Sequence, residues 1–355
     1  MERSRVNINM PIISVCIPAY NRPEVLPALL DSILEQDFDD YEIVICEDKS
    51  PLRQDIAKVV SNYLNKFPGR IAYFENEKNL GYDANLRNLF EKATGQYCMF
   101  MGNDDLMCAG ALSTVAGALG RHPDVGVILR SYASFDGTPD NIAQVFRYFD
   151  KEKKFPAGAE TIATFYRRSV VIPGMVIHRE AALELTTERF DGTLLYQLYL
   201  VANILVTKNA VFLPEILVLY RNGGVPDFGN SEKEKGKFIP TEQTPASSVY
   251  FVQGMLDIVA HTEKARNVSI YYSILSDIGN YSYPILAIQA RRPLRVFVKY
   301  GYDLAKLGLW RYPLFHLYFW ALLLVGPTQL DKLIIYIKSR MGHTPRFGTA
   351  AKKGA

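Results

Sequence analysis

Four short apolar segments alternate with amphipathic segments of helical period over the first 125 residues. The apolar segments cover residues 12–18, 41–46, 70–75 and 96–101. Between them, apolar side chains recur every three or four residues, which indicates helices. Strands that are apolar throughout and are joined by helices form parallel sheets covered on both faces. The sequence therefore predicts an α/β fold with a mostly parallel sheet flanked by helices.

The pattern changes along the rest of the chain. Residues 125–135, 171–178 and 211–221 have the composition of further strands, and residues 159–168 and 194–204 that of helices. Residues 223–246 are rich in Gly, Pro and charge, which predicts a mobile functional loop or a linker. The remainder is helical in pattern, and four prolines divide it into separate helices: Pro284, Pro293, Pro313 and Pro327. We expect four parts, with bounds 1–125, 126–222, 223–246 and 247–355.

Charge is distributed unevenly between the two ends of the chain. The 355 residues are 48% hydrophobic, which excludes a disordered chain, and their formal net charge is only +3. Residues 291–355, however, hold 12 Lys and Arg against two acids, a net +10, while the rest sums to −7. A basic end on an acidic body suggests an anionic partner, either a membrane surface or a nucleic acid, unless it is simply a solvated face.

Polar turns follow the predicted strands of the first half. The turns are Pro18-Ala19-Tyr20-Asn21-Arg22, Glu47-Asp48-Lys49-Ser50, Asn79-Leu80-Gly81 and Gly102-Asn103-Asp104-Asp105. Each alone has a structural explanation, such as Asn21 capping a helix. Together they meet at the carboxyl edge of one parallel sheet, where such folds bind ligands. The adjacent Asp104 and Asp105 repel each other and suit a divalent cation, although an Asp-Asp turn also caps helices.

The segments ISVCIPAYNR, EIVICEDKS and NLGYDANLRNLFEKATGQYCMFMGNDD resemble the nucleotide-binding half of the family 2 glycosyltransferases. That resemblance implies the GT-A fold, a Rossmann-like sheet, here with a C-terminal α-helical region. Residues 1–125 would be its nucleotide-sugar-binding half and 126–222 its acceptor-binding half. Three positions depart from the family pattern: Glu47 and Lys49 stand where Asp and Gly are usual, and Asn103 replaces the first acid of the metal motif.

The resemblance also implies roles for single residues. Pro18, Ala19 and Tyr20 would flank the uracil and ribose, and Asp48 would accept from the base N3–H. Asp104 would lie on the ribose and diphosphate side, and Asp105 would bind Mn²⁺ or Mg²⁺ together with Asp104. The same nucleotide-sugar site would include Arg22, Glu47, Asn79, Asp83 and Asn103.

An inverting transfer needs a carboxylate that takes a proton from the acceptor hydroxyl. The family places an acidic pair before a helix in its second half, and this chain has no such pair. We expect Asp191 to be the base, with Glu188 as the second candidate; a plain turn acid is an equal alternative for Asp191. Tyr196 and Gln197 follow on the same predicted helix, either as acceptor contacts or as helix surface.

The basic end of the chain interleaves cations with aromatic and apolar residues. This composition favours an interfacial helix on a membrane, or packing against the catalytic domain or a second subunit of a homodimer, and disfavours nucleic acid. The longest apolar run, residues 314–326, is too short to span a bilayer. The N-terminus lacks a signal-peptide pattern and the four cysteines suggest reduced thiols. We expect a peripheral protein on the cytoplasmic face of the inner membrane.

The predicted function is an inverting, metal-dependent glycosyltransferase. Its donor would be a nucleotide diphosphate sugar, UDP-linked, and its acceptor a hydroxyl of a polyprenyl-diphosphate-linked glycan of the kind used in bacterial surface polysaccharide or lipopolysaccharide assembly. Two alternatives stay open: a non-catalytic nucleotide-sugar-binding scaffold subunit, and a polyprenyl-phosphate monoglycosyltransferase.

Overall fold

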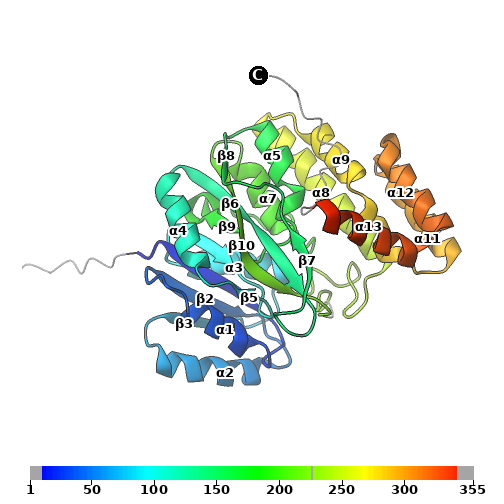
Figure 1. The fold of residues 1–355 in the computed structure, drawn as a ribbon. Helices are drawn as coiled ribbons and strands as arrows, with labels where there is room; N and C mark the ends of the chain where they lie inside the picture. The colour runs from blue at the N-terminus through cyan, green and yellow to red at the C-terminus, as the bar shows by residue number, and fades with distance from the viewer. Residues whose placement is uncertain (1–9, 225–226, 342–355) are drawn as a thin grey trace, which may run out of the picture.

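One mixed sheet organises the first two thirds of the protein. The computed structural model describes residues 10–224 and 227–341 (Figure 1). Among these, ten strands form one sheet with the order β3-β2-β1-β4-β9-β6-β10-β5, to which β7 is added beside β6 and β8 beside β10. The strands are β1 Ile13–Ala19, β2 Tyr41–Glu47, β3 Ile71–Glu75, β4 Tyr97–Phe100, β5 Leu106–Met107, β6 Val125–Phe135, β7 Ile142–Phe146, β8 Lys153–Phe155, β9 Val176–His178 and β10 Asn209–Arg221.

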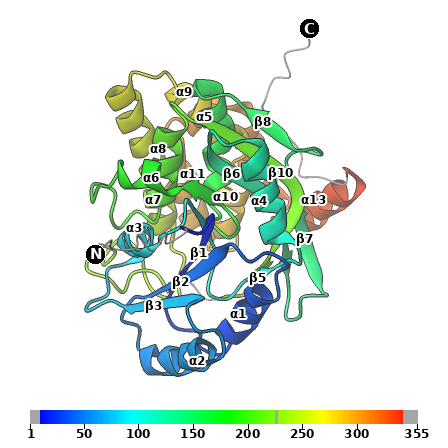
Figure 2. The same cartoon turned by 90° about the vertical axis from the view of Figure 1, so that its left-hand side faces the viewer.

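The first four strands form the parallel part of the sheet. β1 pairs in parallel with β2 and β4, and β2 with β3. The connecting helices cover both faces, with α1 and α2 on one side and α3 on the other (Figure 2). Their bounds are α1 Leu26–Leu34, α2 Arg53–Lys66, α3 Tyr82–Lys92 and α4 Ala111–Arg121. The predicted alternation of strands and helices in this half is confirmed.

The second half extends the sheet with reversed strands. β9 is antiparallel to both of its neighbours, β4 and β6, while β6 and β10 are parallel to each other. β9 begins only at Val176, because residues 170–173 leave the sheet and line a cavity instead. The helices of this half are α5 Ala159–Phe165, the short 3₁₀ turn η1 Arg167–Ser169, α6 Arg179–Leu183 and α7 Tyr196–Ile204.

The described part of the predicted loop 223–246 packs against the first half. Ser231 and Glu234 are buried. The Glu234 carboxylate accepts the backbone N–H of Tyr82 and that of Gly229, each at 2.8 Å. This loop therefore lies over the N-terminal end of α3.

Six helices follow, and a proline lies at the start of five of them, including Pro245 in α8. They are α8 Pro245–Arg266, α9 Tyr271–Asn280, α10 Tyr283–Gln289, α11 Leu294–Lys306, α12 Pro313–Leu324 and α13 Pro327–Met341, with a 3₁₀ turn η2 Leu309–Arg311 before α12. Pro284 lies in the first turn of α10, Pro293 caps α11, and Pro313 and Pro327 open α12 and α13. The predicted helix boundaries are thus confirmed, since proline fits the first turn of a helix but not its interior.

These C-terminal helices share a core with the sheet domain. Tyr166 donates its hydroxyl hydrogen to the carbonyl of Met255 in α8 at 2.7 Å. α8 packs on α7 and α11 packs on α8, so Phe297 and Tyr300 of α11 belong to the same buried cluster as Phe165 and Leu198. Within the described ranges, every helix is too short or too polar to cross a bilayer.

Candidate functional site

The four predicted turns converge on one cavity of about 490 Å³ at the carboxyl ends of β1 to β4. Its lining includes Pro18, Tyr20 and Arg22 from the first turn, and Asp48 and Asn79 from the second and third. The fourth turn contributes Asn103, Asp104 and Asp105. Ala19, Glu47 and Asp83 do not line this cavity.

Asp48 is held rigidly at one end of the cavity. Its carboxylate accepts the side-chain amide of Asn76 and the backbone N–H groups of Leu80 and Gly81, each at 2.8 Å. Burial raises the pKa of Asp48 to about 6, against the lowering effect of these hydrogen bonds. Oδ2 accepts only from Gly81 among the described residues, which leaves it room to accept from a ligand.

Glu47, the neighbour of Asp48, is used by the fold. Its buried carboxylate accepts the N–H groups of Lys49 and Ser50 and pairs with the guanidinium of Arg53. Lys49 has a φ of 52°, in the left-handed region that favours glycine. The structure thereby explains both departures at this turn: the glutamate supports a backbone conformation that the lysine adopts at some cost.

Asp104 and Asp105 line the same cavity from the turn that follows β4. Asp105 is 1% exposed and accepts the backbone N–H of Arg221 at 3.0 Å. Burial and the charge of Asp104 raise its pKa to about 7. A Cβ on Gly102 would lie 2.5 Å from the Asp105 carboxylate oxygen, so glycine is required there for this close approach.

The carboxylate pair fits a divalent cation that is shared with a ligand. Mg²⁺ is commonly bound by one or two carboxylates together with substrate phosphates. Among the described residues no group of three or more His, Cys, Asp or Glu side chains could hold a metal without such help. The chemistry of Asp104 and Asp105 therefore matches a cation completed by diphosphate oxygens.

Arg22 connects this pair to the loop that follows β10. Its guanidinium pairs with Asp104 and, at 3.4 Å, with Asp227. The side-chain amide of Asn21 also donates to Asp227, at 3.3 Å. Residues from the first turn, the fourth turn and the 223–246 loop thus meet at one point of the cavity rim.

Backbone strain gathers around the cavity. In the described part of the chain, six residues other than glycine have a positive φ, and four of them belong to turns beside this site: Asn21, Arg22, Lys49 and Leu194. Such conformations persist where the surroundings over-determine them, and they cluster at functional sites.

Comparisons with known proteins relate part of the chain to one family. The family described as "Glycosyl transferase family 2" matches residues 14–185. This segment is a family 2 glycosyltransferase domain. The whole architecture is that of the GT-A glycosyltransferases.

One named relative is similar to part of this chain. The chain is 39% identical over 107 residues to a GalNAc(5)-diNAcBac-PP-undecaprenol beta-1,3-glucosyltransferase of Campylobacter jejuni, a match that covers 30% of this chain and 34% of that protein. The match thus spans about a third of the relative's length.

Two solved structures resemble the chain at low identity. One is S. aureus TarS 1-349 in complex with UDP-GlcNAc, with a TM-score of 0.54, 16% identity and coverage of 96% of this chain and 95% of that one. The other is GalNAc-T7 with UDP, GalNAc and Mn²⁺, with a TM-score of 0.52, 13% identity and coverage of 81% and 59%. At these identities the likeness concerns the fold.

Asp83 of the family 2 domain supports the site from behind. Its buried carboxylate accepts the N–H groups of Gly192, Thr193 and Leu194 at 2.8 to 3.0 Å, and that of Tyr196 at 2.8 Å. Burial raises its pKa to about 6. Asp83 therefore fixes the turn into α7 and does not face the cavity.

The two predicted base residues also lie outside the cavity lining. Asp191 is buried in a two-pronged ion pair with Arg87, with nitrogen to oxygen distances of 2.7 and 2.8 Å. Glu188 is exposed. For Asp191 to accept a proton from a substrate, this ion pair would have to open. Its role as base stays a prediction.

Several residues that line the cavity could not be predicted from the sequence, and they lie outside the family 2 domain. Asp227 and Glu234 reach the cavity from the 223–246 loop, Arg221 from the end of β10 and Phe251 from α8. The polar composition of the loop marked it as functional, but nothing in its sequence placed particular carboxylates in the site. Long-range contacts of this kind leave no local signal.

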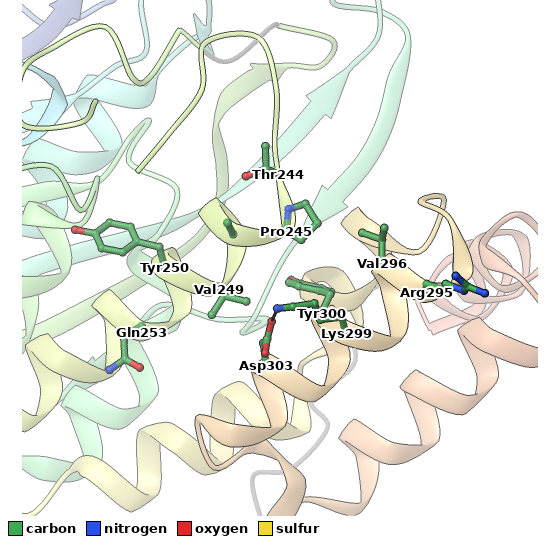
Figure 3. A pocket seen from close by; sticks show the side chains of 11 residues that line it. Thr244, Pro245, Val249, Tyr250, Gln253, Arg295, Val296, Lys299, Tyr300 and Asp303 are labelled. Carbon is green, nitrogen blue, oxygen red and sulfur yellow. Dashed lines mark hydrogen bonds and ion pairs between the residues drawn. The ribbon is translucent and has the colours of Figure 1, made fainter. Parts of the chain in front are cut away.

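A second hollow of about 820 Å³ lies between the first turns of α8 and one face of α11 (Figure 3). Its cations are Arg295 and Lys299, and Lys299 pairs with Asp303 one turn later at 2.5 Å. It shares no lining residue with the acidic cavity. None of the site residues predicted from the sequence lines this second hollow.

Proposed function

We propose that the protein is an inverting, metal-dependent glycosyltransferase. It moves a sugar from a UDP-linked nucleotide sugar to a hydroxyl of a polyprenyl-diphosphate-linked glycan. The single observation that carries this proposal is the convergence of Asp48, Asp104 and Asp105 on one cavity within a family 2 domain. TarS, a structure of similar fold, was solved with UDP-GlcNAc, which supports a UDP-linked donor.

The donor is bound at two places. Asp48 Oδ2 accepts the N3–H of the uracil, while Pro18, Tyr20 and Asn79 line the neighbouring wall around base and ribose. Asp104 and Asp105 would hold Mn²⁺ or Mg²⁺, which would supply positive charge to offset that of the departing diphosphate. Arg22 leaves Asp104 for the diphosphate when the donor enters, because phosphate oxygens then compete for the guanidinium.

Transfer requires a carboxylate that removes the acceptor hydroxyl proton as that oxygen attacks the anomeric carbon and the UDP leaves from the opposite face. Asp191 and Glu188 are the candidates from sequence, and Asp191 must first part from Arg87. Asp227 and Glu234 are the carboxylates of the loop that already line the cavity. Glu234 accepts two backbone N–H groups at 2.8 Å, whereas Asp227 contacts Asn21 and Arg22 at the longer distances of 3.3 and 3.4 Å, so Asp227 is the more loosely held of the two.

The acceptor assignment rests on similarity to named proteins. The Campylobacter jejuni relative is named for a glycan on undecaprenyl diphosphate. A substrate of that class carries a sugar hydroxyl on a long apolar chain, which brings the enzyme to a membrane surface.

The C-terminal helices offer a surface for such contact. On α12 the side chains of Leu317, Trp320 and Leu324 are 60%, 53% and 79% exposed. Their spacing of three and four residues places them on one face of the helix. Trp310 and Arg311 lie in the turn before it, with the guanidinium 5.7 Å from the indole. Exposed apolar rings beside cations are typical of helices that lie in a membrane interface.

This contact makes the protein peripheral, and the use of a nucleotide sugar places it on the cytoplasmic face of the inner membrane. The same apolar face of α12 is the surface that a homodimer would cover.

A non-catalytic nucleotide-sugar-binding subunit is the second candidate. It is favoured by one observation, the ion pair that occupies Asp191. A polyprenyl-phosphate monoglycosyltransferase is a close enzymatic alternative, which differs only in the acceptor.

Hydrolysis of nucleotide sugars tests the proposal. UDP-glucose, UDP-galactose, UDP-GlcNAc and UDP-GalNAc are incubated with the protein, with and without Mn²⁺, and released UDP is measured. We expect Mn²⁺-dependent release for at least one donor and its loss in Asp105→Ala. Donor binding without any release, with or without an undecaprenyl-linked acceptor, would instead identify the binding subunit.

A further inference from the structure

Gln197 lines the cavity, and its buried side-chain amide oxygen is unpaired among the described residues. The side chain is 2% exposed and lies in the first turn of α7. Its Nε2 donates to the carbonyl of Val170 at 3.3 Å, while Oε1 has no hydrogen-bond partner within residues 10–224 and 227–341. Turning the amide over would place an oxygen against the Val170 oxygen, so this orientation is the one that the surroundings dictate.

A buried amide oxygen without a hydrogen-bond partner destabilises the folded state. Such a group is rare in native proteins, so its presence needs a physical reason. Here the explanation is the cavity, since Gln197 and Val170 both line it. A ligand that donates a hydrogen bond would complete the amide. A carboxylate at this position could take a proton, whereas a neutral amide can only bind and orient.

Hydrogen bonds fix the position of Gln197 from two sides. Asp83 takes the four N–H groups of the turn that leads into α7, and Leu194 in that turn has a φ of 65°. The start of α7 is thus fixed from α3, and the Val170 carbonyl fixes the amide from the loop before β9. An acceptor with this support is preorganised for a ligand group.

We propose that Gln197 binds the transferred sugar, with Oε1 accepting a hydrogen bond from a hydroxyl or acetamido N–H of the donor's pyranose. This inference rests on the proposed function. Asp48 and the carboxylate pair account for the nucleoside and the diphosphate, and the sugar is the next part of the same ligand in the same cavity. Gln197 then distinguishes a sugar that offers a donor group at this point from one that does not.

The test compares binding of a UDP-sugar with binding of UDP. Calorimetry in Mn²⁺ first finds which of UDP-glucose, UDP-galactose, UDP-GlcNAc and UDP-GalNAc binds most tightly to the wild-type protein. The variant Gln197→Met keeps the side-chain volume and removes the acceptor. We expect this variant to lower the affinity for that UDP-sugar by about tenfold, because one hydrogen-bond donor of the ligand is left unpaired. The affinity for UDP should stay within about twofold of the wild-type value.

Gln289→Met is the matched control. Gln289 is also fully buried with an unpaired Oε1, but it lies on α10 outside the cavity lining. We expect its affinities for UDP-sugar and UDP to match those of the wild type.

Three results would overturn the inference. Unchanged UDP-sugar affinity in Gln197→Met would show that the amide does not touch the sugar. Equal weakening of UDP and UDP-sugar would show that Gln197 acts through the fold. Failure of the wild-type protein to bind UDP or any of the four donors would remove the proposed function as well, and that outcome is distinct from the first two.

Discussion

The acidic cavity and the C-terminal helices depart from ordinary burial in opposite ways. Around the cavity, the carboxylates Asp48 and Asp105 are buried, and burial raises the pKa of each, to about 6 and about 7. On α12, large apolar side chains are exposed. Buried charge needs a compensating ligand, and exposed apolar surface needs a covering partner. The two regions therefore fit the two partners proposed above, a nucleotide with its cation in the cavity and an apolar surface on α12.

A similar division separates carboxylates within the cavity region. The carboxylates of Glu47, Asp83 and Asp191 accept hydrogen bonds from backbone N–H groups or form ion pairs with arginines. Asp48, Asp104 and Asp105 face the cavity. The first set should control the stability of the fold, and the second set should control ligand binding. Each of the following variants tests this difference.

Loss of Asp83 should have the largest effect on the fold. Asp83→Ala leaves four N–H groups in the turn before α7 without their acceptor, so we expect the free energy of unfolding to fall by about 3 to 5 kcal/mol in urea denaturation. The control Asp55→Ala, at an exposed position on α2, should change it by less than about 0.5 kcal/mol. A stable Asp83→Ala variant that fails only in donor binding would assign Asp83 to the ligand site instead.

The Arg87–Asp191 pair should behave as a structural unit. Asp191→Ala leaves the partly buried Arg87 guanidinium without its carboxylate partner, although the Thr187 carbonyl still accepts from it, and should cost about 3 kcal/mol of unfolding free energy. The double variant Arg87→Met with Asp191→Leu should recover most of this loss. We expect the double variant to retain donor hydrolysis within about tenfold, because Asp191 does not line the cavity. A stable double variant that binds UDP normally but has lost transfer would instead establish Asp191 as the base.

Membrane binding should depend on the exposed face of α12. Replacing Leu317, Trp320 and Leu324 together by Ser should weaken co-sedimentation with anionic phospholipid vesicles by about tenfold or more, because each apolar side chain contributes on burial. Donor hydrolysis in solution should not change. Truncation before α11 is a poorer test, since Phe297 and Tyr300 belong to the core.

The control for that variant is Ile142→Ser with Val145→Ser, two exposed apolar residues of β7. Equal loss of vesicle binding in this control, or no loss in the α12 variant, would contradict membrane contact through α12.

The smallest expected effect is the pH dependence of UDP affinity in a chelator. Asp48 accepts a ligand N–H when ionised, and its pKa in the free protein is raised to about 6 by burial. Affinity should therefore be constant above this pKa and should fall by up to about tenfold per pH unit below it. The ratio of wild-type to Asp48→Asn affinity isolates this residue and should follow the same curve; a flat ratio between pH 5 and 8 would contradict the assignment.

Much of the fold could be predicted from sequence because its signals are local. Residues 125–135 have the composition of a strand and form β6 with the same bounds. Prolines at 313 and 327 marked two helix starts. β9 was predicted to begin at residue 171 but begins at Val176, and residues 171–173 have the composition of a strand but line the cavity instead.

The candidate site was predicted only where its residues follow strands of the parallel sheet. Asp48, Asp104 and Asp105 come directly after strand signals, so topology alone brings them together. Gln197 and Glu234 come from segments about 90 and 130 residues after Asp104, and only tertiary packing brings them to the cavity. Asp83 and Glu47 show the converse, because a motif position alone does not say whether a carboxylate faces a ligand or a backbone turn.

Calorimetric titration of UDP-sugars into the wild-type protein, with Mn²⁺ and with EDTA, tests the central claim most directly. The account predicts that at least one UDP-sugar binds, that Mn²⁺ strengthens binding by about tenfold or more, and that Asp105→Ala removes the gain from Mn²⁺. Binding that is equally tight in Mn²⁺ and in EDTA, or the absence of binding in both, would contradict it.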